Sequence, residues 1–235
     1  DIYFYLEKQK NNFADGLIGF NIEDNKIKLN GFINIQLNNV INKSENINVF
    51  WSADQEKFQK LESLITFPYI INSKIGINAK FNIYKENNNF TNIMHETGLI
   101  FKTYKSTNLI ISYQNKNSIT NESLSDSKQN NIGVGVIFNN KSTKLNLSGY
   151  FGKREINNTL ENNFQLNIKT LHTKTIKKIQ ASFSTNSSLI FSKGLHENEL
   201  LFFGGSNSLK GFDENHFRAK KYIITTSIVS YYIEE

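Results

Sequence analysis

Cysteine is absent from this chain of 235 residues, and proline and tryptophan occur once each. The lack of cysteine excludes disulfides, thiolate nucleophiles and thiolate metal ligands. The sequence also lacks a run of about eighteen apolar residues, which excludes a transmembrane helix on length alone. The first residues, DIYFYLEK, do not have the basic, apolar and small-residue succession of an export signal. We therefore expect any such signal to have been removed or to lie outside this sequence.

Charge of one sign is not concentrated in any segment of the sequence. Lys and Arg number 27 against 21 Asp and Glu, which gives a formal net charge of +6. The tightest basic groups are Lys153–Arg154, Lys177–Lys178, and Arg218 with Lys220–Lys221, and all are too short for a nucleic-acid-binding stripe. We expect no nucleic acid partner, and we assign most of the charge to loops, rims or a water-filled interior.

Apolar and polar residues alternate with a period of two along most of the chain, which is typical of β-strands with two different faces. In KIGINAKFNIY, residues 74–84, every second side chain is apolar, and the run has about the ten residues of a tilted membrane strand. The pattern predicts roughly twelve strands, at residues 16–22, 27–38, 47–51, 61–66, 74–84, 98–104, 109–113, 132–138, 145–151, 164–168, 179–191 and 222–232. The Asn-, Ser- and Lys-rich segments between them, such as residues 85–92 and 115–131, are predicted connections.

These strands and the lack of an amphipathic helix predict an all-β fold. A soluble β-sandwich also alternates apolar and polar residues, so it is one alternative. An antiparallel transmembrane β-barrel is the other, and its mean hydropathy, −0.43 here, stays low because alternate residues face water. Aromatic residues near predicted strand ends favour the barrel, because they suit membrane interfaces; they are Phe50, Trp51, Tyr69, Tyr84, Tyr104, Tyr113, Tyr150, Phe151, Tyr222, Tyr231 and Tyr232.

No arrangement of residues indicates catalysis. The four histidines have no metal-ligand spacing. Ser206 and Ser208 follow glycines but lack the strand-to-helix elbow of a hydrolase nucleophile. A phosphate-binding Gly-Lys-Ser/Thr ending is missing as well. We expect no enzyme, no metal and no cofactor.

A glycine-bearing segment, FFGGSNSLKGFDENHF at residues 202–217, lies in a long connection between two predicted strands. Adjacent glycines permit backbone angles closed to other residues, and connections of this length are uncommon unless functional or disordered. The segment resembles the sixth extracellular loop of the BamA/TamA family of outer-membrane β-barrel assembly proteins, which folds back inside the barrel. The matching residues are Gly204, Gly205, Ser208, Leu209, Lys210, Gly211 and Phe212. Lys210 stands where arginine is usual, so it keeps the charge but loses the forked guanidinium.

Two further segments are similar to this family. Pro68 and Tyr69, followed by Gly76, resemble the end of the fourth barrel strand and the start of the fifth. The N-terminal residues resemble the last strand of a periplasmic POTRA domain and its linker. The resemblance implies the end of a POTRA domain at residues 1–10 and a barrel at 11–235, with about twelve of the family's sixteen strands.

The function implied by the resemblance is insertion of other β-barrels into the outer membrane of a Gram-negative-type cell. A client strand would add to an edge opened at a lateral seam. The seam strand would contain Gly16, Leu17, Ile18, Gly19 and Phe20, and the loop motif would brace the barrel interior. The implied partners are outer-membrane lipid, unfolded β-barrel clients and accessory assembly subunits. Two alternatives stay open, a two-partner secretion translocator and a passive porin-like channel.

Overall fold

The structure is a computed structural model that describes residues 12–23, 26–54, 58–70, 73–87, 89–104, 106–121, 125–205 and 208–232. The predicted POTRA end at residues 1–10 therefore lies outside the described residues. Twelve strands form one antiparallel sheet in the order β1-β2-β3-β4-β5-β6-β7-β8-β9-β10-β11-β14. Their bounds are β1 (Phe13–Glu23), β2 (Lys26–Asn38), β3 (Asn46–Asp54), β4 (Phe58–Phe67), β5 (Ile75–Glu86), β6 (Phe90–Tyr104), β7 (Thr107–Thr120), β8 (Ser127–Asn139), β9 (Thr143–Ile156), β10 (Thr159–Ile176), β11 (Ile179–Ile190) and β14 (Lys221–Tyr231).

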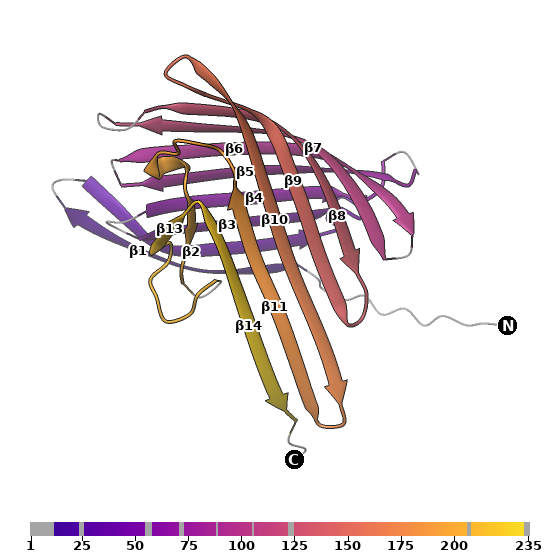
Figure 1. The fold of residues 1–235 in the computed structure, drawn as a ribbon. Helices are drawn as coiled ribbons and strands as arrows, with labels where there is room; N and C mark the ends of the chain where they lie inside the picture. Colours follow the sequence, from indigo (N-terminus) through magenta and orange to yellow (C-terminus); the bar gives the residue numbers. More distant parts are fainter. Residues whose placement is uncertain are drawn as a thin grey trace.

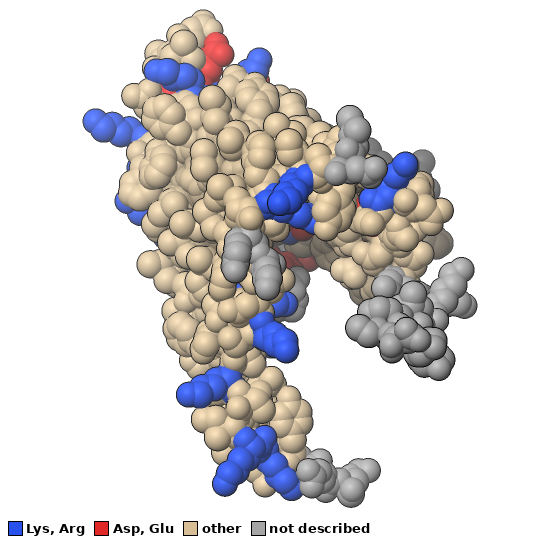
Figure 2. Space-filling model, turned by 90° about the vertical axis from the view of Figure 1, so that its right-hand side faces the viewer, with Lys and Arg blue, Asp and Glu red and all other residues tan. Residues whose placement is uncertain are grey.

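The sheet curls around a hollow interior, and its two edge strands are β1 and β14. The curl is visible in Figure 1, and Figure 2 shows the hollow between two arms of the molecule. Within the described residues, β1 pairs only with β2, and β14 pairs only with β11. The connection between β11 and β14 lies on the concave side and contains a short 3-10 helix, η1 (Glu197–Glu199), and a small hairpin of β12 (Leu201–Phe203) and β13 (Phe217–Ala219). No helix among the described residues has the length and apolarity needed to cross a membrane.

Because successive hairpins join the strands, the turns fall at two ends of the sheet. We call the end that carries the connection between β11 and β14 the loop end. The opposite end, which we call the turn end, carries the turns at residues 39–45, 68–74, 105–106, 140–142 and 177–178. In Figure 1 the strands β10, β11 and β14 extend farthest toward the turn end.

The strands expose their apolar faces and bury their polar ones. On β8, Ile132 is 63% exposed and Val134 is 59% exposed, whereas Asn131, on the opposite face of the same strand, is only 1% exposed. The predicted alternation on β5 follows the same rule, with Ile75 and Phe81 exposed and Asn78 buried. A sandwich packs its apolar faces together in a core, so the soluble alternative is wrong for this chain.

The buried face is held together by hydrogen bonds between polar side chains. The Glu96 carboxylate accepts hydrogen bonds from Lys80 at 3.2 Å, Gln114 at 3.0 Å and Tyr150 at 3.1 Å. Nearby, Asn163 donates to Asn131 at 3.0 Å. Buried polar groups need such partners to offset the loss of water, so this network occupies the inner face of β5 to β10.

All twelve predicted strands are present, and most are longer than predicted. The segment at residues 115–131 was expected to be a connection, but β7 continues to Thr120 and β8 begins at Ser127. Its inward-facing polar residues pair between strands, as in the hydrogen bond from Asn131 Nδ2 to Gln114 Oε1 at 3.3 Å. Asn115 and Asn130 pair on the outer face, beside Tyr113, so these strand ends carry polar residues on both faces.

At least four of the aromatic residues expected at membrane interfaces point inward instead. Tyr150 is buried and donates to Glu96, and Tyr84 packs against Phe202 of the inward-folded connection, with ring centroids 5.0 Å apart. Tyr222 packs against Phe203 of the same connection, with ring centroids 4.7 Å apart, and Phe50 lines a pocket beside it. All four positions lie on the inner face, where aromatic rings fill space between polar side chains. Tyr69, Tyr113, Phe151, Tyr231 and Tyr232 are exposed, but Tyr113 lies in the middle of β7 and not near its end.

Candidate functional site

The connection between β11 and β14 contains the motif predicted from the sequence, and its glycines adopt the predicted conformations. The backbone angle φ is 126° at Gly204, 88° at Gly205 and 91° at Gly211, a region that favours glycine. The Ser208 hydroxyl donates to the Gly204 carbonyl and accepts from the Gly204 N–H, both at 2.7 Å. Ser208 therefore closes the turn that begins at the glycine pair, while Ser206 lies outside the described residues.

Gly204 and Gly205 are buried because other parts of the connection pass close by. A Cβ atom at Gly204 would lie 2.6 Å from the Asp213 carbonyl oxygen and 3.0 Å from the His216 nitrogen. A Cβ atom at Gly205 would lie 2.1 Å from the Glu214 side chain. The nearest neighbours of Gly204 are backbone atoms, so glycine is required there for packing as well as for backbone conformation. The neighbour of Gly205 is the end of a flexible side chain that can move, so at that position the positive φ is what favours glycine.

The remaining motif residues are more exposed than the glycine pair. Phe212 is exposed and packs edge-on against Phe217, with ring centroids 4.9 Å apart, and Leu209 is half-buried. Lys210 is exposed, and neither a hydrogen bond nor an ion pair joins it to another described residue. Its bracing of the wall stays a prediction, while other residues of the connection make the wall contacts seen in the structure.

The first of these wall contacts is an ion-pair cluster, which we call the loop anchor and define as Arg154, Glu161 and Glu199. The Arg154 guanidinium donates to both oxygens of Glu199, each at 2.5 Å, and to Glu161 Oε2 at 2.9 Å. It also donates to the Gly194 carbonyl at 3.1 Å. The side chains of Arg154 and Glu199 are each only 1% exposed, so a wall residue of β9 and a residue of η1 share a two-point contact shielded from water.

The local sequence positions both partners of this ion pair. On β9, Tyr150, Arg154 and Ile156 are all buried on the inner face, because every second residue of a strand points the same way. On the loop side, the His196 N–H donates to Glu199 Oε2 at 3.1 Å. Glu199 is therefore held by its own turn before it meets Arg154.

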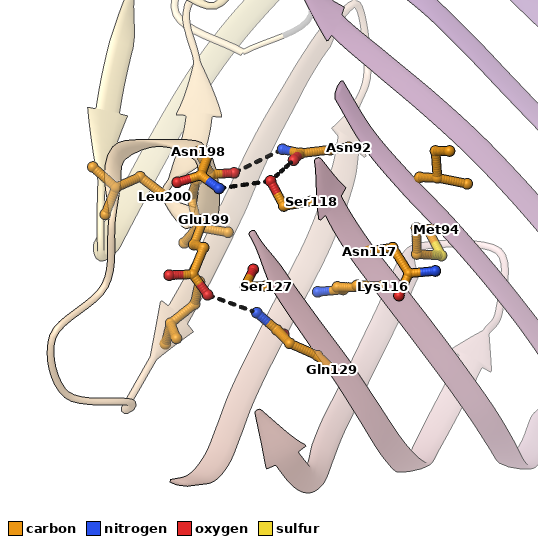
Figure 3. A pocket seen from close by; sticks show the side chains of 13 residues that line it. Asn92, Met94, Lys116, Asn117, Ser118, Ser127, Gln129, Asn198, Glu199 and Leu200 are labelled. Atoms are coloured by element: carbon orange, nitrogen blue, oxygen red, sulfur yellow. Dashed lines mark hydrogen bonds between the residues drawn. The ribbon is translucent and has the colours of Figure 1, made fainter. Parts of the chain in front are cut away.

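Asn198, the residue before Glu199, makes the second wall contact, with β6 and β7. Its side-chain amide donates to the Ser118 hydroxyl at 2.7 Å, and its backbone carbonyl accepts from the Asn92 side-chain amide at 2.7 Å. The Ser118 hydroxyl in turn donates to Asn92 Oδ1 at 2.6 Å. Figure 3 shows this closed set of bonds beside the hydrogen bond from Gln129 to Glu199, around a small pocket that Lys116, Asn117 and Leu200 also line.

The third wall contact joins the small hairpin to β5 and β6. The Phe202 ring lies 5.0 Å from Tyr84 and 5.9 Å from Phe90. Arg218 on β13 pairs with Glu86 at the end of β5 and with Glu197 of η1, the latter at 3.3 Å. The three contacts together attach the connection to the inner face from β5 to β9.

Glu199 makes the loop anchor sensitive to acid. Burial alone would raise the pKa of Glu199, but hydrogen bonds from Arg154 and the His196 N–H, together with the Arg154 charge, outweigh burial and hold this pKa below its usual range. A carboxyl with a lowered folded-state pKa adds stability at pH values above its unfolded pKa of about 4.3, and that stability is lost as the pH falls toward the folded value. The expected window of loss therefore lies below about pH 4.3.

We predict that acidification below this value loosens the connection between β11 and β14 while the strands remain paired. Protease cleavage within residues 191–220 of the folded protein, measured from pH 7 to pH 3 with an acid-active protease, should rise steeply below about pH 4.3. Glu199→Gln should cleave readily at all pH values and lose the pH step. A step of unchanged size in Glu199→Gln would contradict the assignment.

The predicted seam residues lie on β1 at one edge of the sheet. Leu17 is 71% exposed and Phe20 is 72% exposed, and they lie on opposite faces because their positions differ by an odd number. Leu17 pairs directly with Phe32, which lines a pocket together with Asp213 and Asn215 of the connection. The edge strand therefore carries exposed apolar side chains on its inner as well as its outer face. Gly16, Ile18 and Gly19 complete the predicted seam on β1.

The residues that attach the loop were not identified from the sequence. Arg154 and Arg218 were noted only as members of short basic groups, and Glu199 and Asn198 were not singled out. The one available signal was the segment ENE at residues 197–199, which carries two glutamates in a connection that also contains four glycines. Among the described residues, no group of three or more His, Cys, Asp or Glu side chains could hold a metal ion.

Comparison with known proteins identifies the fold. The sequence matches neither a protein-family model nor a curated protein. The structure is similar to CdiB from Acinetobacter baumannii, with a TM-score of 0.60 and 14% identity over 96% of this chain and 47% of CdiB. It is also similar to OmpT, an outer membrane protein of Vibrio cholerae, with a TM-score of 0.50 and 10% identity over 87% of this chain and 65% of OmpT.

A second OmpT structure, the trimer form, gives a TM-score of 0.50 at 12% identity. The chain therefore has the all-β antiparallel fold of outer-membrane β-barrels, as predicted, and spans about half the length of CdiB.

Proposed function

We propose that this chain is the barrel part of an outer-membrane translocase or insertase in a Gram-negative-type cell. The observation that carries the proposal is the connection between β11 and β14, which is attached inside the curled sheet by the fully buried pair of Arg154 and Glu199. A loop fixed at this depth occupies the interior and can control what passes through it. Outward-facing apolar side chains such as Ile132 and Val134 support a lipid environment.

The proposed mechanism uses β1 as the strand to which a client adds. An unpaired strand edge presents N–H and C=O groups in a row, and another strand can pair with them. The exposed side chains of Leu17 and Phe20 would give an incoming amphipathic strand apolar contacts on either face. Since the loop is anchored on β5 to β9, the β1 edge can move without releasing it. We propose no catalytic step, cofactor or metal, and we propose unfolded β-barrel proteins as clients, with accessory subunits as further partners.

A two-partner secretion translocator is the second candidate, and a specific observation favours it. CdiB is such a translocator, and its structure aligns with 96% of this chain. In that case an unfolded exoprotein would pass through the interior, and the loop would be the element that yields. A passive porin-like channel is the third candidate and is supported only by the polar interior.

An engineered disulfide tests the seam, and the lack of native cysteine makes it the sole disulfide in this chain. Ile18→Cys in the complete protein would be paired with a cysteine in the last barrel strand. We expect the oxidised form to insert a model β-barrel client into proteoliposomes at least tenfold more slowly, with recovery on reduction, because a closed seam removes the free strand edge. Insertion is measured by the folded, protease-protected fraction of the client.

The matched control places cysteines at Phe151 and Phe164, which pair across β9 and β10, far from the seam in strand order. This disulfide should not change insertion. Full insertion with the seam cross-linked would remove the seam mechanism. Export of an exoprotein under the same condition would favour the two-partner secretion translocator, and a steady, large, ungated single-channel conductance would favour the porin-like channel.

A further inference from the structure

The two ends of the sheet differ sharply in charge. At the loop end, acidic and basic residues are mixed and often paired, as in Arg154 with Glu199 and Arg218 with Glu86. At the turn end, the described residues within three positions of the five turns include eight lysines and a single acidic residue, Glu45. We call these lysines the basic rim; they are Lys43, Lys74, Lys102, Lys141, Lys144, Lys174, Lys177 and Lys178.

Glu45 does little to neutralise the basic rim. Its side chain is buried, and its carboxylate accepts hydrogen bonds from the backbone N–H groups of Ile41 at 2.8 Å and Lys43 at 3.0 Å. It thus serves to close the turn at residues 39–45. Seven of the eight rim lysines are exposed, and Lys102 is half-buried. Figure 2, which looks at the right-hand side of Figure 1, shows blue basic atoms spread over the molecule and down its lower arm, with few red acidic ones.

Folding brings lysines from separate turns together. The Lys102 N–H donates to the Lys74 carbonyl at 3.0 Å, so these residues from two neighbouring turns lie side by side. The Lys102 ammonium also lies 3.5 Å from the centre of the Tyr69 ring. At the end of the longest strands, the Tyr232 N–H donates to the Lys178 carbonyl at 2.8 Å, which places the end of β14 beside the turn between β10 and β11.

Exposed apolar and aromatic side chains accompany the lysines on the same turns. Val40 and Ile41 precede Lys43, Tyr69 lies against Lys102, and Ile176 and Ile179 flank the turn that holds Lys177 and Lys178; Tyr231 and Tyr232 complete the set. Tyrosine and lysine together suit a membrane–water interface, with rings at the headgroup level and ammonium groups toward phosphate. An acidic protein partner would account for the lysines but not for these apolar neighbours.

We propose that the basic rim is a docking surface for anionic phospholipid headgroups and holds the turn end of the barrel at an anionic leaflet. Each lysine near such a surface contributes about 1 kcal/mol of attraction, which falls off within a Debye length. The inference rests on the proposed membrane location but not on the translocase mechanism. It names the lipid chemistry that this end of the barrel selects.

Spin-labelled lipids test this proposal with the complete protein reconstituted in phosphatidylcholine bilayers. Electron paramagnetic resonance gives the fraction of a labelled lipid immobilised at the protein. Wild type should immobilise labelled phosphatidylglycerol about fivefold more than labelled phosphatidylcholine at low salt, which is the effect expected of one lysine near the lipid. A variant with all eight rim lysines changed to Gln should have a ratio near one.

A loop-end variant with Lys85, Lys128 and Lys193 changed to Gln is the control, since these lysines are exposed at the mixed-charge end. Its preference for phosphatidylglycerol should match that of wild type.

Equal immobilisation of the two lipids by wild type would overturn the lipid assignment while leaving the membrane location intact. Immobilisation of neither lipid would overturn the membrane location and the inference with it. Loss of the preference in inorganic phosphate but not in chloride of equal ionic strength would assign the rim to free phosphate. Binding of polyglutamate without lipid preference would assign the rim to an acidic polypeptide, and either result overturns the proposal.

Discussion

Arg154→Met is expected to lower the free energy of unfolding by about 3–5 kcal/mol, because removing one partner of a buried pair leaves the other charge without compensation. Glu199 would remain in the interior with its main hydrogen-bond donor gone. Urea unfolding in detergent micelles, followed by the fluorescence of Trp51, the single tryptophan, measures the loss. If the loop anchor supports function, client insertion or exoprotein export should fall at least tenfold in the same variant.

Two further variants separate the ion pair from general disturbance of β9. Lys153→Met changes the adjacent residue, which is exposed and donates to Asn162 at 2.7 Å, and it should cost less than about 1 kcal/mol. The double variant Arg154→Met with Glu199→Leu should recover much of the lost stability, since no buried charge is left unpaired. Equal losses in Arg154→Met and Lys153→Met would refute the anchor.

Gly204→Ala is expected to displace the tip of the connection between β11 and β14. An alanine there adopts an unfavourable positive φ, which costs about 1–2 kcal/mol, and its Cβ would lie 2.6 Å from the Asp213 carbonyl oxygen. Backbone must move to relieve this contact, and overpacking of this kind costs a further 1–3 kcal/mol or so. Limited proteolysis of residues 191–220 in the folded protein should speed up several-fold, because the tip no longer packs on itself.

Gly211→Ala is the matched control for this experiment. Gly211 also has a positive φ, 91°, but nothing lies within 4 Å of a Cβ atom built there. It should therefore show only the conformational cost of about 1–2 kcal/mol and little change in proteolysis. If both alanine variants behave alike, packing at Gly204 is not what shapes the tip.

The strands could be predicted because the alternation pattern of each strand is contained in its own short stretch of sequence. Alternation of apolar and polar side chains marks strands in any sheet with two unlike surroundings, and β5 and β2 appear almost as predicted. The pattern could not reveal which face is buried, because a sandwich and a barrel share it. Polar strand ends, such as residues 115–120 on β7, were missed since they lack the apolar half of the pattern.

The wall contacts of the loop could not be predicted, because each joins residues far apart in the chain. Arg154 and Glu199 are separated by 45 positions, and Glu86 and Arg218 by 132. Neither pair has a local signature, since lone arginines and glutamates are common on any surface. The glycine motif was visible because tight turns impose backbone angles on single residues, yet it marked the tip of the loop and not its attachment.

The strands of this protein expose their apolar face and bury their polar face, and this arrangement determines how the protein can reach its native state. Most proteins collapse in water because burying apolar side chains is favourable. Here the apolar side chains lie on the exposed outer face, and the buried inner face carries asparagine, glutamine and glutamate. Aqueous buffer alone supplies no drive toward this arrangement. The native arrangement becomes favourable only when a bilayer or a detergent micelle covers the apolar outer face. The native structure therefore depends on the surrounding amphiphile as well as on the sequence.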